Sequence, residues 1–200
     1  MKKTYCLLSL FFLTSIINCS SQISIKDPSI PSLLVNKLPY RAAIIYPENF
    51  ENFIHEERVI GRKSWKIDFT RSNKLLFNKI FSSFFSGITI LDEVDSTSSL
   101  GFDLVIKPSI DAIEFSVPEQ SQDETFSVWI RYRIKMFDNN GIEIINWPIS
   151  SYGKTSTSTF ADEQDLANAA VLAMRDAAAL IILQIEKSKK ITNIINLVDE

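Results

Sequence analysis

The sequence predicts an α+β domain, in which a mainly antiparallel sheet of four to five strands carries two helices on one face. Three observations predict this class. Apolar residues alternate without a break between positions 126 and 136, which is typical of a strand with one buried face. Between 72 and 88 they recur every three or four positions, which is typical of a helix. An alanine-rich, helix-forming run extends between 166 and 185.

The chain begins with the pattern of a secretory signal. Lys2 and Lys3 precede an apolar run over residues 5–17, and Cys19 and small polar residues follow. A helix that spans a bilayer needs about 20 apolar residues, and this run is shorter. We therefore expect residues 1–18 to be removed as a signal. Cys6 leaves with them. Cys19 is then the only cysteine, which excludes an intramolecular disulfide or a cysteine-based zinc site in the mature chain.

Residues 16–19, Ile-Ile-Asn-Cys, resemble the lipobox of bacterial lipoproteins. The isoleucine three positions before the cysteine fits that motif, whereas Asn18 departs from the usual small residue. The resemblance implies acylation of Cys19, and two or more acyl chains anchor a protein stably to a membrane. Ser20 and Ser21, with no aspartate after the cysteine, imply sorting to the periplasmic side of the outer membrane. The alternative is an ordinary thiol after an ordinary signal cleavage.

Three segments are expected after the predicted signal. Residues 19–38 are rich in serine and proline without periodicity, and they predict a flexible tether that holds the domain roughly 25 Å from the membrane. An arm packed on the domain is the alternative, because several of these residues are apolar. A single domain is expected over 39–187. Residues 188–200 form a tail whose apolar spacing suits either a short amphipathic helix or a frayed end.

The first half of the domain predicts a central strand, a loop and a helix. Residues 40–47 are apolar on both faces and end at a proline, as a central strand would. Residues 48–69 are charged and irregular, so we expect a loop with a short strand near 65–69. Ser72 caps the predicted helix and Gly87 ends it. A brief strand then follows within residues 88–96.

The second half predicts two long strands and a hairpin. Alternation over residues 101–117 changes parity at Pro108, which predicts a bulge or bend there. After the strand that ends near Met136, an Asp-Asn-Asn-Gly turn allows two registers. A two-residue turn pairs Met136 with Ile145; a three-residue loop pairs Met136 with Ile144 and Arg133 with Trp147. We prefer the second register because it keeps Ile144 on the core face.

The last helix follows a polar segment, residues 148–164, that reads as turns. Thr159 and Asp162 have the spacing of a capping box before the helix. The helix is long enough to cross a membrane, but Arg175 and Asp176 within it would make insertion costly. We therefore expect it to pack against the sheet, where its alanines allow a close approach.

Catalytic and metal-binding patterns are missing from the sequence. The single histidine, His55, stands beside Glu56 and Glu57 in the predicted loop, and no Gly-x-Ser-x-Gly motif accompanies it. The carboxylates of Asp92, Glu93 and Asp95 lack the spacing of a calcium loop. Five glycines provide no phosphate-binding loop. We expect no catalytic residue, no metal, no cofactor and no enzymatic activity.

One face of the long strand is the candidate binding surface. Long basic and aromatic side chains alternate with the core residues there, and the preferred register adds a tryptophan from the next strand. Trp and Arg together are typical of contact hot spots, although a solvated sheet face, or one covered by the tether, has the same composition. The formal net charge of −3 excludes a nucleic-acid partner. The candidate residues are Trp129, Arg131, Arg133, Lys135, Phe137 and Trp147.

The segments FDLVIKPSIDAIEF, VWIRYRIKMFDNNGIEI and ANAAVLAMRDAAALIILQI resemble small accessory lipoproteins of the Gram-negative envelope. These include the YajG-like lipoproteins and those that assist lipopolysaccharide assembly or ABC transport. The resemblance implies a non-catalytic lipoprotein that assists or scaffolds an envelope assembly or transport complex. Its expected partners are the membrane, through the acyl chains on Cys19, and a protein of the envelope. The alternative is a periplasmic binding module for a lipid, a glycan or another anionic or amphipathic ligand.

Overall fold

The computed structural model describes residues 20–25, 27–30, 35–58, 64–92, 101–120, 123–157 and 163–188. The secondary structure of this part of the chain follows in sequence order. The elements are β1 (Ser20–Ser24), β2 (Leu38–Ile45), α2 (Glu48–Glu51), β3 (Ile54–Arg58), β4 (Ser64–Asp68), α3 (Thr70–Phe84), β5 (Phe85–Leu91), β6 (Leu104–Ser116), β7 (Thr125–Asp138), β8 (Glu143–Ser156) and α4 (Glu163–Lys187).

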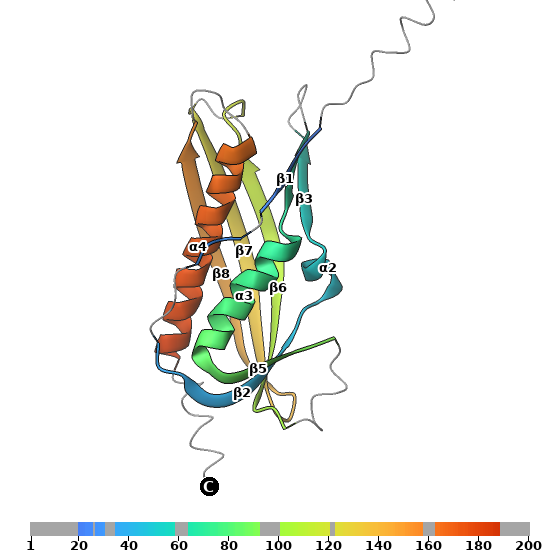
Figure 1. Cartoon of the computed structure of the whole chain (residues 1–200), viewed down its shortest axis with the longest axis vertical. Helices are drawn as coiled ribbons and strands as arrows, with labels where there is room; N and C mark the ends of the chain where they lie inside the picture. Colours follow the sequence, from blue (N-terminus) through green and yellow to red (C-terminus); the bar gives the residue numbers. More distant parts are fainter. Residues whose placement is uncertain are drawn as a thin grey trace, which may run out of the picture.

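The strands form two sheets. The larger has the order β5-β2-β6-β7-β8, with β2 parallel to both of its neighbours and the other pairs antiparallel. The smaller has the order β1-β4-β3. Helices α3 and α4 lie across one face of the larger sheet, and the smaller sheet lies beside α3 (Figure 1). The predicted α+β class, with two helices on one face, is confirmed.

The core lies between the larger sheet and these covering elements. Phe77 of α3 contacts Tyr132 of β7 with ring centroids 5.3 Å apart, and Trp65 of β4 contacts Phe126 at 6.0 Å. Removing such apolar surface from water is the main force that holds the layers together. The buried apolar residues of β7 are the six that the alternation predicts: Phe126, Val128, Ile130, Tyr132, Ile134 and Met136.

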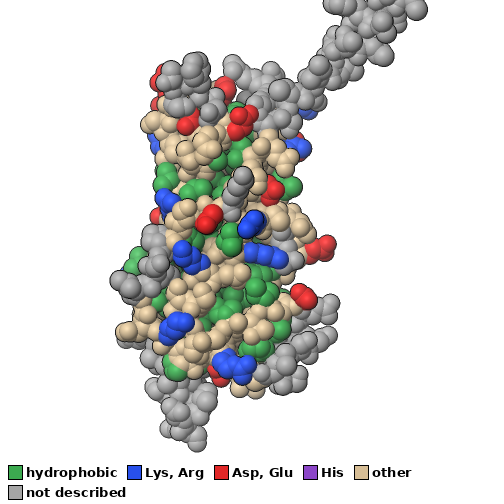
Figure 2. All heavy atoms as spheres, viewed as in Figure 1, with side chains coloured by type: hydrophobic (Ala, Val, Ile, Leu, Met, Phe, Trp, Pro, Cys, Tyr) green, Lys and Arg blue, Asp and Glu red, His purple; other side chains and the backbone are tan. Residues whose placement is uncertain are grey.

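Helix α4 packs against β7 and β8, as expected. It is long and apolar enough to cross a membrane by length and composition, but its alanine-rich side is buried on the sheet. The helix passes so close to Gly153 of β8 that an added Cβ there would overlap the backbone of Ala169 and Ala173. Seen from this side, basic and acidic side chains are interspersed over the surface (Figure 2).

The predicted flexible tether is wrong for the residues that the structure describes. Ser20–Ser24 form β1, which pairs in parallel with β4. The side chains of Ile23, Ile25 and Ile30 are buried in the core. Alternating isoleucines bury enough apolar surface to order this segment, so residues 20–25 and 27–30 form an arm packed on the domain.

Several boundaries also differ from the predictions. The predicted loop over residues 48–69 contains α2 and a β3–β4 hairpin, so His55 lies in a strand. Gly87 lies within β5 and does not end α3. The bulge in β6 falls at Asp111, three residues after Pro108. Residues 148–156, which read as turns, continue β8.

The preferred hairpin register is wrong beyond the turn. The three-residue loop does form, because Asp138 N–H donates to Ile142 O at 3.0 Å, and Gly141 adopts the positive φ of 79° that such a loop needs. A bulge then follows in β8, and Met136 pairs with Ile145. The shift of one residue moves Trp147 to the helix side of the sheet, where it pairs with Ile134.

Some predictions fall outside the described residues. These are the signal and lipidation site (residues 1–18 and Cys19), the metal candidates Glu93 and Asp95, the capping box of Thr159 and Asp162, and the tail beyond 188.

Candidate functional site

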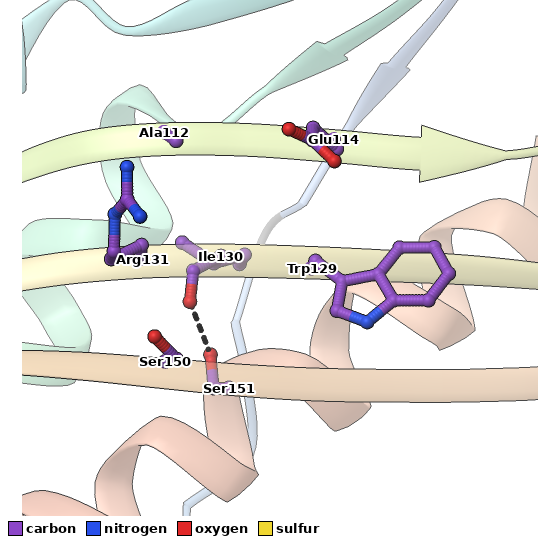
Figure 3. A pocket seen from close by; sticks show the side chains of 7 residues that line it. All are labelled: Ala112, Glu114, Trp129, Ile130, Arg131, Ser150 and Ser151. Atoms are coloured by element: carbon purple, nitrogen blue, oxygen red, sulfur yellow. Dashed lines mark hydrogen bonds between the residues drawn. The ribbon is translucent and has the colours of Figure 1, made fainter.

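The candidate site lies on the face of the larger sheet that points away from α3 and α4, which we call the open face. It consists of the outward-pointing side chains of β6, β7 and β8. Figure 3 looks onto it, with the helices behind the strands. The residues on which the site depends are Asp111, Ala112, Glu114, Trp129, Arg131, Arg133, Lys135, Glu143, Asn146, Ser150 and Tyr152.

An aromatic pair marks this face. Trp129 and Tyr152 are cross-strand partners on β7 and β8, with ring centroids 4.8 Å apart. Their side chains are 45% and 40% exposed. The Tyr152 hydroxyl lies 3.2 Å from Ser127 Oγ, and the Tyr152 backbone N–H donates to Asp176 Oδ2 of α4 at 3.0 Å. These bonds hold Tyr152 in place despite its exposure to solvent, and the Trp129 ring packs against it.

Two of the basic residues converge on Asp111, the residue at the bulge of β6. Arg133 donates from Nε and Nη2 to the two carboxylate oxygens of Asp111, at 3.2 and 2.5 Å. Arg131 Nε lies 3.9 Å from Asp111 Oδ2. The hydrogen bonds to Asp111 are the main cause that raises the pKa of Arg133 above its usual value, and the negative charge of Asp111 adds to it. The bulge thus places one carboxylate between two guanidinium groups.

Lys135 is neutralised in the same way, by Glu143 of β8 at 3.3 Å. Glu143 also accepts a hydrogen bond from Asn146 Nδ2 at 3.0 Å. That hydrogen bond is the main cause that lowers the pKa of Glu143, and Lys135 adds to it. The stripe that reads as basic in the sequence is therefore made of ion pairs.

A shallow hollow of about 280 Å³ lies beside the aromatic pair. Its small side chains come from Ala112 and Ser150, and Trp129, Glu114 and Arg131 stand around it (Figure 3). Glu114 and Arg131 give its rim opposite charges. The hollow can thus receive an apolar group between two polar anchors.

Two of the predicted surface residues contribute little to this site. Phe137 packs against a small apolar cluster near Val105, and Lys107 Nζ lies 5.0 Å from its ring centroid. Trp147 lies on the helix side of the sheet, against the core. Tyr152 was missed, because Pro148 and Gly153 made the sequence around it read as turns rather than as a strand.

Of the predicted catalytic and metal candidates, the structure describes His55 and Asp92. His55 Nε2 lies 3.8 Å from Glu57 Oε2, and its ring packs edge-on against Phe115 at 5.6 Å. Within the described ranges, no group of three or more His, Cys, Asp or Glu side chains could hold a metal ion. The absence of enzymatic activity stays a prediction.

No protein-family model matches this chain, and the search among curated proteins found no match. Among similar solved structures, a minor lipoprotein from Acinetobacter baumannii is 8% identical over 75% of this chain and 92% of its own, with a TM-score of 0.46. Lipoprotein B of Nitrosomonas europaea is 18% identical over 74% and 84%, with a TM-score of 0.40. A lipoprotein from Neisseria meningitidis is 13% identical over 75% and 100%, with a TM-score of 0.35. Similarity at this level assigns no function.

Proposed function

We propose that this protein is a non-catalytic lipoprotein, anchored through Cys19 on the periplasmic side of the outer membrane, that assists an envelope assembly or transport complex by binding a protein partner on its open face. The anchor is supported by the signal-like segment and the lipobox-like residues 16–19. The observation that carries the binding role is the exposed, mutually packed Trp129–Tyr152 pair beside the hollow.

The chemistry of the open face favours a protein over an anionic ligand. Arg131 and Arg133 already share Asp111, and Lys135 already pairs with Glu143. An anion would have to displace these carboxylates, whereas an apolar side chain flanked by neutral polar groups can enter the hollow and leave the ion pairs intact. Aromatic anchors beside a small pocket are typical of the centre of protein interfaces.

The binding role is tested by photo-crosslinking in cells. A photoreactive amino acid replaces Ser150 in the hollow, and a matched control replaces Ile54, which is 51% exposed on β3 of the smaller sheet. We expect one defined envelope protein to be linked from position 150, and not from 54. The Trp129→Ala/Tyr152→Ala variant should abolish that adduct.

The partner identified in this way is then purified and titrated against the wild-type domain and the double variant. Binding by the wild type alone supports the proposal. Adducts that contain only lipid or glycan, or an adduct that survives the double substitution, would contradict it. Metabolic labelling with an acyl chain tests the anchor separately: wild type should incorporate the label and Cys19→Ala should not.

A further inference from the structure

The strand β1 begins at Ser20, which is the residue immediately after Cys19. Its pairing with β4 is continuous, from Ser20 opposite Ser64 to Ser24 opposite Asp68. Consecutive Cα atoms are only about 3.8 Å apart. A lipid attached to Cys19 is therefore joined directly to a strand of the folded domain.

The arm that begins with β1 is held by its side chains as well as by its backbone. Ile23 and Ile25 are 5% and 3% exposed and belong to the core cluster. Further along the arm, Arg175 Nε of α4 donates to Pro28 O at 2.9 Å, and Lys79 Nζ of α3 donates to Ile30 O. Both covering helices thus hold the arm in place, and its release would expose core residues.

The pairing of β1 identifies the end of the domain at which the lipid would be attached. Ser21 pairs with Trp65, and the Trp65 ring contacts Phe126, the second residue of β7. In Figure 1 the arm reaches the domain at the end where β6 finishes and β7 starts. The β7–β8 turn lies at the other end of β7, a distance of roughly 45 Å at about 3.3 Å per residue.

We propose that the docked strand β1 holds this domain directly on the bilayer surface, with the β6–β7 connection toward the lipid and the β7–β8 turn away from it. This inference rests on the proposed anchoring through Cys19. The β6–β7 connection carries Glu119, Asp123 and Glu124, which give it no attraction to anionic lipid. The orientation therefore comes from the docked strand and not from charge.

The orientation also limits what can bind the open face. Trp129 is four residues from the start of β7, or about 13 Å along the strand. The Trp129–Tyr152 pair then stands close above the membrane, within reach of the membrane-proximal part of a partner. A partner of this face is accordingly a protein that is itself embedded in or anchored to the same membrane.

The orientation is tested on the chain from Cys19 to Glu200, whose only thiol is that of Cys19. The thiol is coupled to a maleimide phospholipid in phosphatidylcholine vesicles that also contain a lipid with a headgroup quencher. A fluorescent amino acid stands at Glu119 or at Asn140, which are both exposed and lie at opposite ends of β7. We expect several-fold stronger quenching at 119 than at 140, without dependence on salt.

Two matched insertions separate a docked strand from a free tether. A flexible Gly/Ser linker between Cys19 and Ser20 should abolish the difference between the two labels, because it frees β1 from the lipid. The same linker between Pro31 and Ser32 lies downstream of the docked arm and should preserve the difference. Circular dichroism and the urea midpoint verify that both insertions leave the domain folded.

Equal quenching at the two positions in the parent chain would overturn the proposal. So would equivalent effects of the two insertions, since a free tether lengthens equally at either point. The chemical coupling does not depend on acylation in cells. A failure of acyl labelling at Cys19 therefore contradicts the proposed lipoprotein and is distinguishable from a failure of the orientation.

Discussion

The two faces of β7 show how one strand serves packing on one side and recognition on the other. On the helix side, each alternate residue from Phe126 to Met136 is at most 1% exposed. On the open side, the residues between them make ion pairs with β6 and β8, and the Trp129 ring rests beside Tyr152. Folding therefore depends on one face, and the other is free to change its chemistry without loss of the fold.

The comparison is tested most strongly by truncating two neighbouring residues of β7. Ile130→Ala leaves a cavity in a core that is otherwise close-packed, and should lower the free energy of unfolding by about 4 kcal/mol. Trp129→Ala removes a larger side chain but only an exposed aromatic contact, and should cost about 1 kcal/mol. Urea unfolding at constant pH measures both values.

The reverse order of effects would contradict the comparison. A Trp129→Ala cost near that of Ile130→Ala would mean that another part of the chain covers the open face. The slope of unfolding against urea should stay the same in both variants, because each leaves the extent of the folded core unchanged.

The second prediction concerns the contact between the helix-side face and α4. Gly153→Ala places a Cβ against the backbone of Ala169 and Ala173, and neither can move without displacing the helix. Overpacking of this kind should lower the free energy of unfolding by about 3 kcal/mol. Urea unfolding and the near-ultraviolet circular dichroism of the tryptophans measure the effect.

Gly87→Ala on β5 is the matched control for this substitution. Its added Cβ would meet only Arg41 Cγ, at an ordinary 3.8 Å. We expect a change within about 0.5 kcal/mol, as for other substitutions that create no clash. A comparable loss at both glycines would show that backbone flexibility, rather than the approach of α4, is what Gly153 provides.

Gly153 also explains why the second half of β8 escaped prediction. Glycine and proline interrupt the pattern that marks a strand in a sequence, yet Gly153 occurs in β8 because a helix passes close by. The regular elements were predictable: β7 and α3 from the periods of their apolar residues, β2 from its short apolar run, and α4 from its alanine-rich composition. The arm formed by residues 20–25 and 27–30 was not predictable. Its few isoleucines stand in a polar segment, and whether they are buried depends on tertiary contacts that no local pattern shows.

The candidate site was predictable in part for a similar reason. Alternation placed Trp129, Arg131 and Arg133 on one face, and this holds. The rest of the site depends on the register of the strands. The register places Asp111 at the bulge and Tyr152 opposite Trp129, and it puts Trp147 on the other face of the sheet. A single extra residue in β6 or β8 changes which side chains meet, and no local pattern determines where a bulge falls.

The third prediction concerns a polar pair inside the covered face. Tyr132 is fully buried and donates its hydroxyl proton to Asn73 Oδ1 at 2.8 Å, while Asn73 Nδ2 has no hydrogen-bond partner. Tyr132→Phe should lower the free energy of unfolding by about 2 kcal/mol, because the buried amide then has no partner. Adding Asn73→Leu to it should recover part of that loss, which a double-mutant cycle measures.

Tyr132 should also make stability depend on alkaline pH. Burial raises the pKa of its hydroxyl above the usual 10.0. Below pH 10 both states keep the proton and there is no effect. Above pH 10 the unfolded state loses the proton that the folded state retains, so stability falls by about 1.4 kcal/mol per pH unit. Tyr132→Phe should fall less steeply than wild type above pH 10, and an identical pH dependence of the two would contradict the burial of this hydroxyl.

The smallest expected effect is a change in the pKa of Glu143 on the open face. The hydrogen bond from Asn146 is the main cause that lowers the pKa of Glu143, and the bond from Lys135 contributes less. A carboxylate with a lowered pKa stabilises the fold above its unfolded value, and this contribution is lost as pH falls through the folded value. Asn146→Ala should therefore raise the pKa of Glu143 toward 4.5, and Lys135→Met should raise it as well.

Carboxyl NMR titration at low and high salt separates the two contributions to the pKa of Glu143. Salt screens the attraction between exposed charges such as Lys135 and Glu143, but it leaves the dipole of the Asn146 amide in place. High salt should reproduce the effect of Lys135→Met and leave that of Asn146→Ala intact. If salt alone returned the pKa of Glu143 to 4.5, the open face would owe its order to charge, and an anionic partner could compete for it after all.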